Sequence, residues 1–245
     1  MAKSHNSANL LRGKVALVTG GNRGIGLAIA RALADAGCAL IITGRDPAAL
    51  KRAERELARR ARNLMAALCD VRDPGAVQSL FAEVKCKFHQ LDILVNNAGV
   101  AHANLSVAKL PLEAWTEVIE TNLTGTFLVT QGALPLMKRG SAIVNNLSIA
   151  AKRVFPGSSA YIASKHGALG FTNALREEVR AQGVRVIALL PGAADTAIWN
   201  TLWPEAPRKK MMSAKAVAMA TVNALAAPIE STVEELTILP SAGTL

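Results

Sequence analysis

Short apolar runs alternate with longer amphipathic stretches along the whole chain. The apolar runs VALVT, ALIIT, LMAAL, DILVNN, AIVNNL and VRVIALL, with a last one at residues 236–239, predict buried strands. The stretches between them predict helices at residues 27–37, 47–62, 73–87, 112–137, 158–182 and 213–226. Uninterrupted apolar strands that alternate with helices are typical of a parallel sheet covered on both faces. The pattern therefore predicts an α/β chain with a doubly wound parallel sheet of about seven strands.

No repeat, low-complexity tract or linker interrupts this alternation. We therefore expect a single domain over residues 1–245, in which residues 1–12 form a short tail. No apolar run approaches the roughly 18 residues of a membrane-spanning helix, so no membrane partner is predicted. Cys38, Cys69 and Cys86 lack metal-ligand spacing, which predicts no metal site and fits a reducing, cytoplasmic compartment.

The formal net charge of +10 leaves two kinds of partner open. It is compatible with nucleic acid, and equally with an anionic small molecule such as a dinucleotide phosphate or an acyl-carrier substrate. The densest basic stretch, residues 51–62, is interleaved with Ala, Leu and Glu, which indicates a solvated helix face. Aromatic residues, at 4%, are scarce for base stacking. The small anion is therefore favoured and no nucleic-acid partner is predicted.

The stretch TGGNRGIG, residues 19–26, lies between the first predicted strand and the first predicted helix. In that position Gly20 permits a tight turn, Gly24 lets a pyrophosphate approach the backbone, and Gly26 allows close packing of helix on sheet. The free N–H groups at the helix start attract an anion. The turn predicts a Rossmann-type dinucleotide-binding domain.

Several motifs follow one another in the order of a known family. They are TGGNRGIG, CDV, NNAG, the Asn of ETNLTG, the Ser of NNLS, YIASK and LLPG. With them the chain resembles, over nearly its whole length, the short-chain dehydrogenase/reductase family in its branch of roughly 250 residues. The resemblance implies an oxidoreductase that uses a nicotinamide dinucleotide, and a 3-oxoacyl-acyl-carrier-protein reductase is one named possibility.

The end of the second strand indicates which dinucleotide is bound. Gly44 stands where NAD-binding members of the family usually have an acid, and Arg45 follows it. With Arg23 in the glycine turn, Arg45 suits a 2′-phosphate, so NADP(H) is predicted. The alternative is that Arg45 pairs with Asp46 in a solvated turn.

The resemblance also implies the remaining cofactor contacts. Asp70 and Val71 are expected at the adenine, NNAG at the adenine ribose, LLPG beside the nicotinamide, and Thr196 at the carboxamide or pyrophosphate. The complete set of expected cofactor-binding residues is Gly20, Asn22, Arg23, Gly24, Ile25, Gly26, Arg45, Asp70, Val71, Asn97, Ala98, Gly99, Tyr161, Lys165, Pro191, Gly192 and Thr196.

Tyr161, the only tyrosine in the chain, lies four residues before Lys165 on a predicted helix. The two side chains share a helix face, and an ammonium near a phenol lowers the phenol pKa. The resemblance implies that Tyr161 exchanges a proton with the substrate oxygen and that Lys165 also binds the nicotinamide ribose. It further implies that Ser148 holds the substrate oxygen and that Asn122 holds a water in a proton relay.

A loop at residues 193–212 corresponds to the substrate lid of related enzymes. Trp199, Trp203, Met211 and Met212 either form an apolar substrate wall or pack against the protein itself. The basic run at residues 208–210 either attracts an anionic substrate or keeps the loop solvated. Arg139 stands where acyl-carrier reductases have a docking arginine, although helix ends favour basic residues anyway.

These observations predict an NADP(H)-dependent enzyme that reduces a ketone to a secondary alcohol, or the reverse. Its partner would be a small carbonyl or alcohol substrate, with an acyl thioester as one candidate. The alternative is an NADP(H)-binding sensor without turnover, which would usually lack part of the Ser/Tyr/Lys set. Family members commonly assemble through the helices that correspond to residues 122–137 and 158–182, so a homo-oligomer, a dimer or tetramer, is expected.

Overall fold

The structure, a computed structural model, describes residues 11–243. Seven strands form one sheet in the order β3-β2-β1-β4-β5-β6-β7, and every neighbouring pair is parallel. The strands are β1 (Val15–Val18), β2 (Ala39–Gly44), β3 (Leu64–Leu68), β4 (Ile93–Asn96), β5 (Ala142–Asn146), β6 (Arg185–Pro191) and β7 (Glu235–Ile238). This confirms the predicted fold class, a doubly wound parallel sheet in a single domain.

Helices connect successive strands. They are α1 (Gly24–Asp35), α2 (Pro47–Leu57), α3 (Pro74–Phe88), α4 (Leu112–Ile119), α5 (Gly125–Ala133), α6 (Ser159–Arg180), α7 (Trp199–Leu202) and α8 (Ala214–Leu225). An aspartate caps the N-terminus of both α2 and α3. Asp46 accepts hydrogen bonds from the Ala48 and Ala49 N–H groups, and Asp73 accepts one from the Gly75 N–H group. Short turns are named below where they matter.

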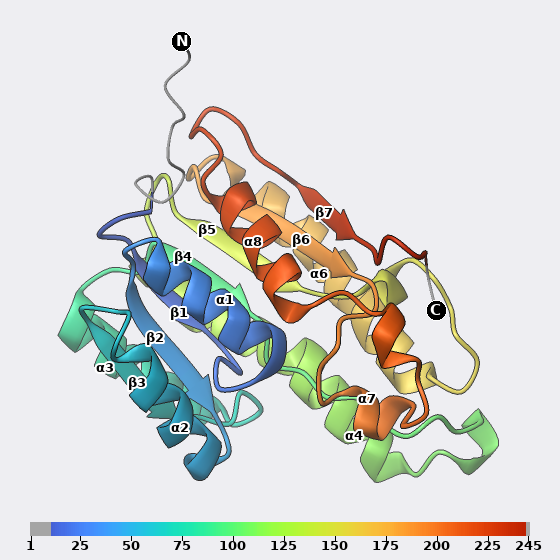
Figure 1. Cartoon of the computed structure of the whole chain (residues 1–245). Helices are drawn as coiled ribbons and strands as arrows, with labels where there is room; N and C mark the ends of the chain where they lie inside the picture. The colour runs from blue at the N-terminus through green and yellow to red at the C-terminus, as the bar shows by residue number, and fades with distance from the viewer. Residues whose placement is uncertain (1–10, 244–245) are drawn as a thin grey trace.

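Each face of the sheet has its own apolar core. On one face, Ile29 and Leu33 of α1 and Leu57 of α2 pack with the inward side chains of the strands, and α8 completes this layer beside α1. On the other face, Val84 of α3 and Leu175 of α6 do the same, together with α5. Figure 1 shows α1, α2 and α8 in front of the sheet. The chain therefore has three layers, with the sheet buried between two layers of helices.

The strand order reverses between β1 and β4, which are neighbours in the sheet although β2 and β3 intervene in sequence. Connections from these two strands leave toward opposite faces, so a crevice opens outside their carboxyl ends. The short helices α4 and α7 lie at that same end (Figure 1). The fold thus places the glycine turn, the strand ends and the lid around one crevice.

Two predicted helices differ from those observed. The helix predicted at residues 47–62 ends at Leu57, because residues 58–63 must turn back so that the Asn63 carbonyl can accept from Leu40 N–H at the start of the β2–β3 pairing. The helix predicted at residues 112–137 is interrupted by a π-helical turn, η3 (Glu120–Thr124), and closes in a 3₁₀ turn, η4 (Leu134–Leu136), which contains Pro135. The predicted tail falls mostly outside the described residues, but Leu11 is buried in the core.

Candidate active site and cofactor cleft

One cavity of about 840 Å³ follows the carboxyl ends of the strands, from β3 at one end to β6 and the lid at the other. Of the residues predicted to bind the cofactor or to act in catalysis, all line this cavity except Gly26 and Asn122. Residues from the glycine turn, NNAG, NNLS, YIASK and LLPG, distant in sequence, therefore meet in a single cleft. Motifs that were identified one by one in the sequence thus form the wall of the same cavity.

The glycine turn has the backbone that its sequence predicted. Gly20 and Gly24 adopt positive φ angles of 61° and 55°, a region in which side chains are strained. A Cβ on Gly26 would overlap the Asn97 side chain and the Gly20 carbonyl oxygen. Gly26 thus lies behind the cavity wall and serves close packing. A turn of this shape at the start of α1 leaves room for a pyrophosphate against the backbone.

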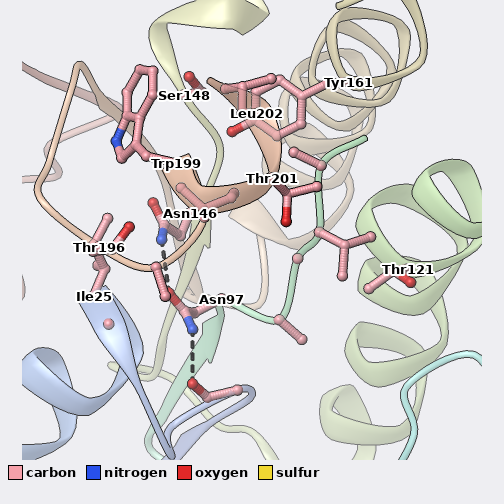
Figure 2. Close-up of a pocket in the computed structure, with 18 of the residues that line it drawn as sticks. Ile25, Asn97, Thr121, Asn146, Ser148, Tyr161, Thr196, Trp199, Thr201 and Leu202 are labelled. Carbon is pink, nitrogen blue, oxygen red and sulfur yellow. Dashed lines mark hydrogen bonds between the residues drawn. The ribbon is translucent and has the colours of Figure 1, made fainter. Parts of the chain in front are cut away.

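Asn97 holds the glycine turn in place. Its Nδ2 donates to the Thr19 carbonyl at 2.9 Å. Its Oδ1 accepts from Asn146 Nδ2 at 2.8 Å (Figure 2). The turn after β1 is thereby tied through β4 to the end of β5. This network fixes the floor of the cleft without using the side chains expected to do chemistry.

Charged residues gather at the β2–β3 end of the cavity. Arg45 does not pair with Asp46; its Nη2 lies 3.0 Å from Oε1 of Glu117 on α4. The Asp70 carboxylate is bound by Arg72, and this hydrogen bond is the largest cause of its lowered pKa. Both ion pairs are partly exposed, so an incoming ligand can exchange them at little cost. This end presents two guanidiniums, Arg45 and Arg23, to the space beside the carboxyl ends of β2 and β3.

Tyr161, Lys165 and Ser148 converge at the other end of the cavity. Lys165 Nζ donates to the Asn146 carbonyl at 3.0 Å and lies 5.6 Å from the centre of the Tyr161 ring. Burial lowers the pKa of Lys165 to about 8. Burial also raises the pKa of Tyr161, and a hydrogen bond with Ser148 opposes that rise. Burial therefore raises the Tyr161 pKa, whereas the sequence predicted that Lys165 would lower it.

Asn122 lies in the π-helical turn and is buried behind the cavity. Its Oδ1 accepts from Val100 N–H at 2.8 Å, and its Nδ2 donates to the Val100 carbonyl at 2.9 Å and to Ser164 Oγ at 3.0 Å. Asn122 thus pins the loop after NNAG to α6, one residue before Lys165. The extra residue of a π turn is what rotates this amide toward the loop.

The lid combines cavity wall and internal packing. Trp199 and Trp203 line the cavity, whereas Met212 pairs with Ala194 and packs against the core. Neither methionine of the predicted wall, at 211 or 212, lines the cavity. Arg208 binds Asp195 at 2.8 Å, so that carboxylate is neutralised close to the glycine turn.

Some lining residues were not identified from the sequence. Among them are Asn104, Glu117, Thr121 and Asn146. Asn146 could have been found, since it precedes Ser148 at a strand end. Glu117 belongs to an ordinary amphipathic helix, and no local signal places it opposite Arg45. His102, in the loop after NNAG, is buried, with Nδ1 against the Ala103 carbonyl.

Within residues 11–243, no cluster of His, Cys, Asp or Glu could hold a metal ion. No helix in the same range is long and apolar enough to cross a membrane. The positive-φ glycines, the close-packed Gly26 and a cavity that is lined from β3 to β6 do fit a nicotinamide dinucleotide. The donor set at the Tyr161 end fits the nicotinamide ribose and a carbonyl oxygen.

Comparisons with known proteins agree with this geometry. A sulfoacetaldehyde reductase of Chromohalobacter salexigens is 41% identical over 185 residues, which is 74% of this chain and 73% of that protein. A 3beta-hydroxysteroid dehydrogenase of Mediterraneibacter gnavus is 37% identical over 189 residues, 76% of this chain and 67% of that protein. The crystal structure of a Burkholderia cenocepacia short chain dehydrogenase in complex with NADP has a TM-score of 0.87 at 32% identity, and covers 96% of this chain and 99% of that chain.

The family model for short chain dehydrogenases matches residues 14–207, which include the glycine turn, the Ser/Tyr/Lys set and most of the lid. The chain belongs to the short-chain dehydrogenase family of oxidoreductases.

Proposed function

We propose that the protein is an NADP(H)-dependent oxidoreductase that reduces a ketone to a secondary alcohol, or runs the reverse reaction. The observation that best supports this is the separation of two sites along one cleft. Arg23 and Arg45 lie at one end, and Ser148, Tyr161 and Lys165 lie together at the other. A dinucleotide laid along the strand ends would span the two.

The cofactor, when bound, supplies the hydride for the carbonyl carbon. Ser148 would donate a hydrogen bond to the carbonyl oxygen and orient it toward Tyr161. Because burial raises the pKa of Tyr161, its phenol is protonated at neutral pH and can give that proton to the developing alkoxide. Lys165, whose pKa near 8 leaves it mostly charged at neutral pH, would bind the nicotinamide ribose and replace the proton. Asn122 would keep α6 and the loop at residues 99–101 in register.

The preference for NADP(H) rests on Arg45 and Gly44. A guanidinium can bind a 2′-phosphate with two parallel hydrogen bonds, and no acidic side chain at position 44 repels it. In the structure Arg45 forms an ion pair with Glu117, and this pair would have to break before Arg45 could bind the phosphate. The two relatives described above do not indicate the charge of the substrate. One is named for sulfoacetaldehyde, which is anionic, and the other for a steroid, which is neutral.

The test is oxidation of NADPH and NADH, followed by absorbance, over a panel of ketones and 3-oxoacyl thioesters. We expect turnover with NADPH, and Arg45→Ala should lower kcat/KM for NADPH by about tenfold or more while leaving NADH little changed, because one charge-assisted contact is lost. Lys51→Ala, on the solvated face of α2, is the matched control. Equal use of both cofactors by the unmodified protein would contradict the NADP(H) assignment. Tight NADPH binding without turnover would favour the sensor.

A further inference from the structure

The ionisable side chains that line the cavity are unevenly distributed. Arg23, Arg45, Asp46, Asp70 and Glu117 all belong to the end near β2, β3 and α4. At the opposite end, Tyr161 and Lys165 are the only ionisable side chains in the lining formed by the described residues. The space in front of Ser148 therefore offers a bound molecule no spare cation.

The wall of this space is mainly apolar. Phe155, Trp199, Leu202 and Trp203 line it, and Figure 2 shows Trp199, Thr201 and Leu202 of the lid beside Ser148 and Tyr161. Trp199 Nε1 donates to the Ala194 carbonyl at 2.9 Å, so the polar atom of the indole is already used. The large flat side chains can cover an apolar ligand, with few neutral polar groups among them.

The cations of the lid do not reach this space. The Arg208 guanidinium donates to Asp195 Oδ1, to the Thr196 carbonyl and to Asn200 Oδ1, at 2.8, 2.7 and 2.6 Å. Lys209 and Lys210 are exposed and absent from the cavity lining. Within this basic run, Arg208 therefore binds other parts of the lid, and Lys209 and Lys210 face solvent.

We propose that the substrate is a neutral, mainly apolar ketone with a ring-containing body, and that small anionic carbonyl compounds are excluded. This inference rests on the proposed carbonyl reduction and specifies its substrate class. A carboxylate or sulfonate enclosed by Phe155, Trp199 and Leu202 would lose its hydration without gaining a counter-charge. The Lys165 ammonium is already held by the Asn146 carbonyl and is assigned to the cofactor ribose.

Matched pairs of ketones test the proposal directly. Acetophenone and 4-acetylbenzoate share a ring and differ in one charge, and ethyl acetoacetate and acetoacetate form a second pair. With NADPH saturating, we expect kcat/KM to favour the neutral member of each pair by at least about 30-fold, because the charge is desolvated without a partner. The formal net charge of +10 attracts anions at long range, so a preference for the neutral member would oppose that field. Equal or faster turnover of the anions would overturn the proposal.

A variant pair tests whether missing charge is the cause. Thr201 lines the cavity on the exposed side of α7, and Thr201→Arg supplies a cation there, whereas Thr201→Gln adds a neutral side chain. We expect Thr201→Arg to raise the ratio of 4-acetylbenzoate to acetophenone turnover by about tenfold over Thr201→Gln, since the carboxylate then has a counter-charge. An unchanged ratio in a variant that still reduces acetophenone would show that charge does not decide the selectivity.

If no ketone is reduced, the proposed function fails, but the substrate class can still be judged by binding. In a Trp115→Phe background the remaining tryptophans are Trp199 and Trp203, both in the cavity wall. Quenching of their fluorescence measures the dissociation constant of each alcohol. A dissociation constant for 1-phenylethanol that is at least about tenfold lower than that for 4-(1-hydroxyethyl)benzoate would support the neutral substrate class. Equal dissociation constants would overturn it.

Discussion

At the scale of single residues, Lys165 places an amine in a buried position, where desolvation disfavours its charged form. Lys165 has an ordinary pKa of 10.5, and burial lowers it to about 8. Between these values the unfolded chain binds more protons than the folded one, so this group makes stability rise with pH from about 8 to 10.5. Below about pH 8 the full cost of the buried charge remains. A buried group with a pKa shifted this far is typical of a functional site.

The first prediction follows from that cost. Lys165→Met should abolish activity yet stabilise the protein without cofactor at pH 7, by about 1–3 kcal/mol, because the buried charge is removed. The gain should shrink as pH rises from 8 toward 10.5, where the native lysine is neutral anyway. Thermal unfolding at several pH values measures both effects. Lys215→Met on the exposed face of α8 is the control, and a pH-independent loss of stability in Lys165→Met would contradict the account.

At the scale of elements, one side chain makes three hydrogen bonds within the lid. Arg208 joins the start of the lid at Asp195 and Thr196 to α7 at Asn200. An isolated bridge between Ala194 and Met212 joins the two ends of the lid to each other. Removing Arg208 would therefore free the middle of the lid while its two ends stay attached.

The second prediction concerns that clamp. Arg208→Ala should raise KM for the ketone by about tenfold or more and change kcat less, because the wall formed by Trp199 is no longer held in place before substrate binds. Lys209→Ala, a neighbouring exposed cation, should leave both constants unchanged and so separates the clamp from a general charge effect. Equal kinetics for the two variants would show that the lid is ordered by other contacts.

The elements also show what the sequence could predict. The strands could be predicted because each is a short, continuous apolar run, and the glycine turn because its glycines follow a strand directly. The interruption at η3 could not be predicted, because a π turn depends on where Asn122 must meet the Val100 backbone. The partner of Arg45 was missed for the same reason. Glu117 reaches it only through the placement of α4 across the cleft.

At the scale of the whole molecule, apolar side chains remain exposed on the long helices. Phe127 of α5 is 43% exposed and meets Phe171 of α6 edge-on, with ring centres 6.2 Å apart. Trp115 of α4 is 38% exposed. Large aromatic side chains gathered on adjoining helices are typical of a surface that another protein covers. We propose that a second copy of this chain covers α5 and α6 in a homo-oligomer.

The third prediction tests that assembly. Phe127→Lys should reduce the mass in sedimentation equilibrium relative to the unmodified protein, because a cation replaces an aromatic side chain in the contact. Ile229→Lys is the control, since Ile229 is 69% exposed in the loop before β7. A monomeric mass for the unmodified protein would contradict the proposal outright.

The account as a whole depends on Tyr161 as proton donor, and one measurement tests this most directly. Tyr161→Phe removes a single oxygen from a side chain that lines the cavity. The measurement is NADPH oxidation with acetophenone, beside the dissociation constant for NADPH. We predict that kcat falls by about 10²–10⁴ while NADPH affinity stays within a few-fold, because general acid catalysis is lost and the cleft is kept. Turnover by Tyr161→Phe close to that of the unmodified enzyme would contradict the assigned role.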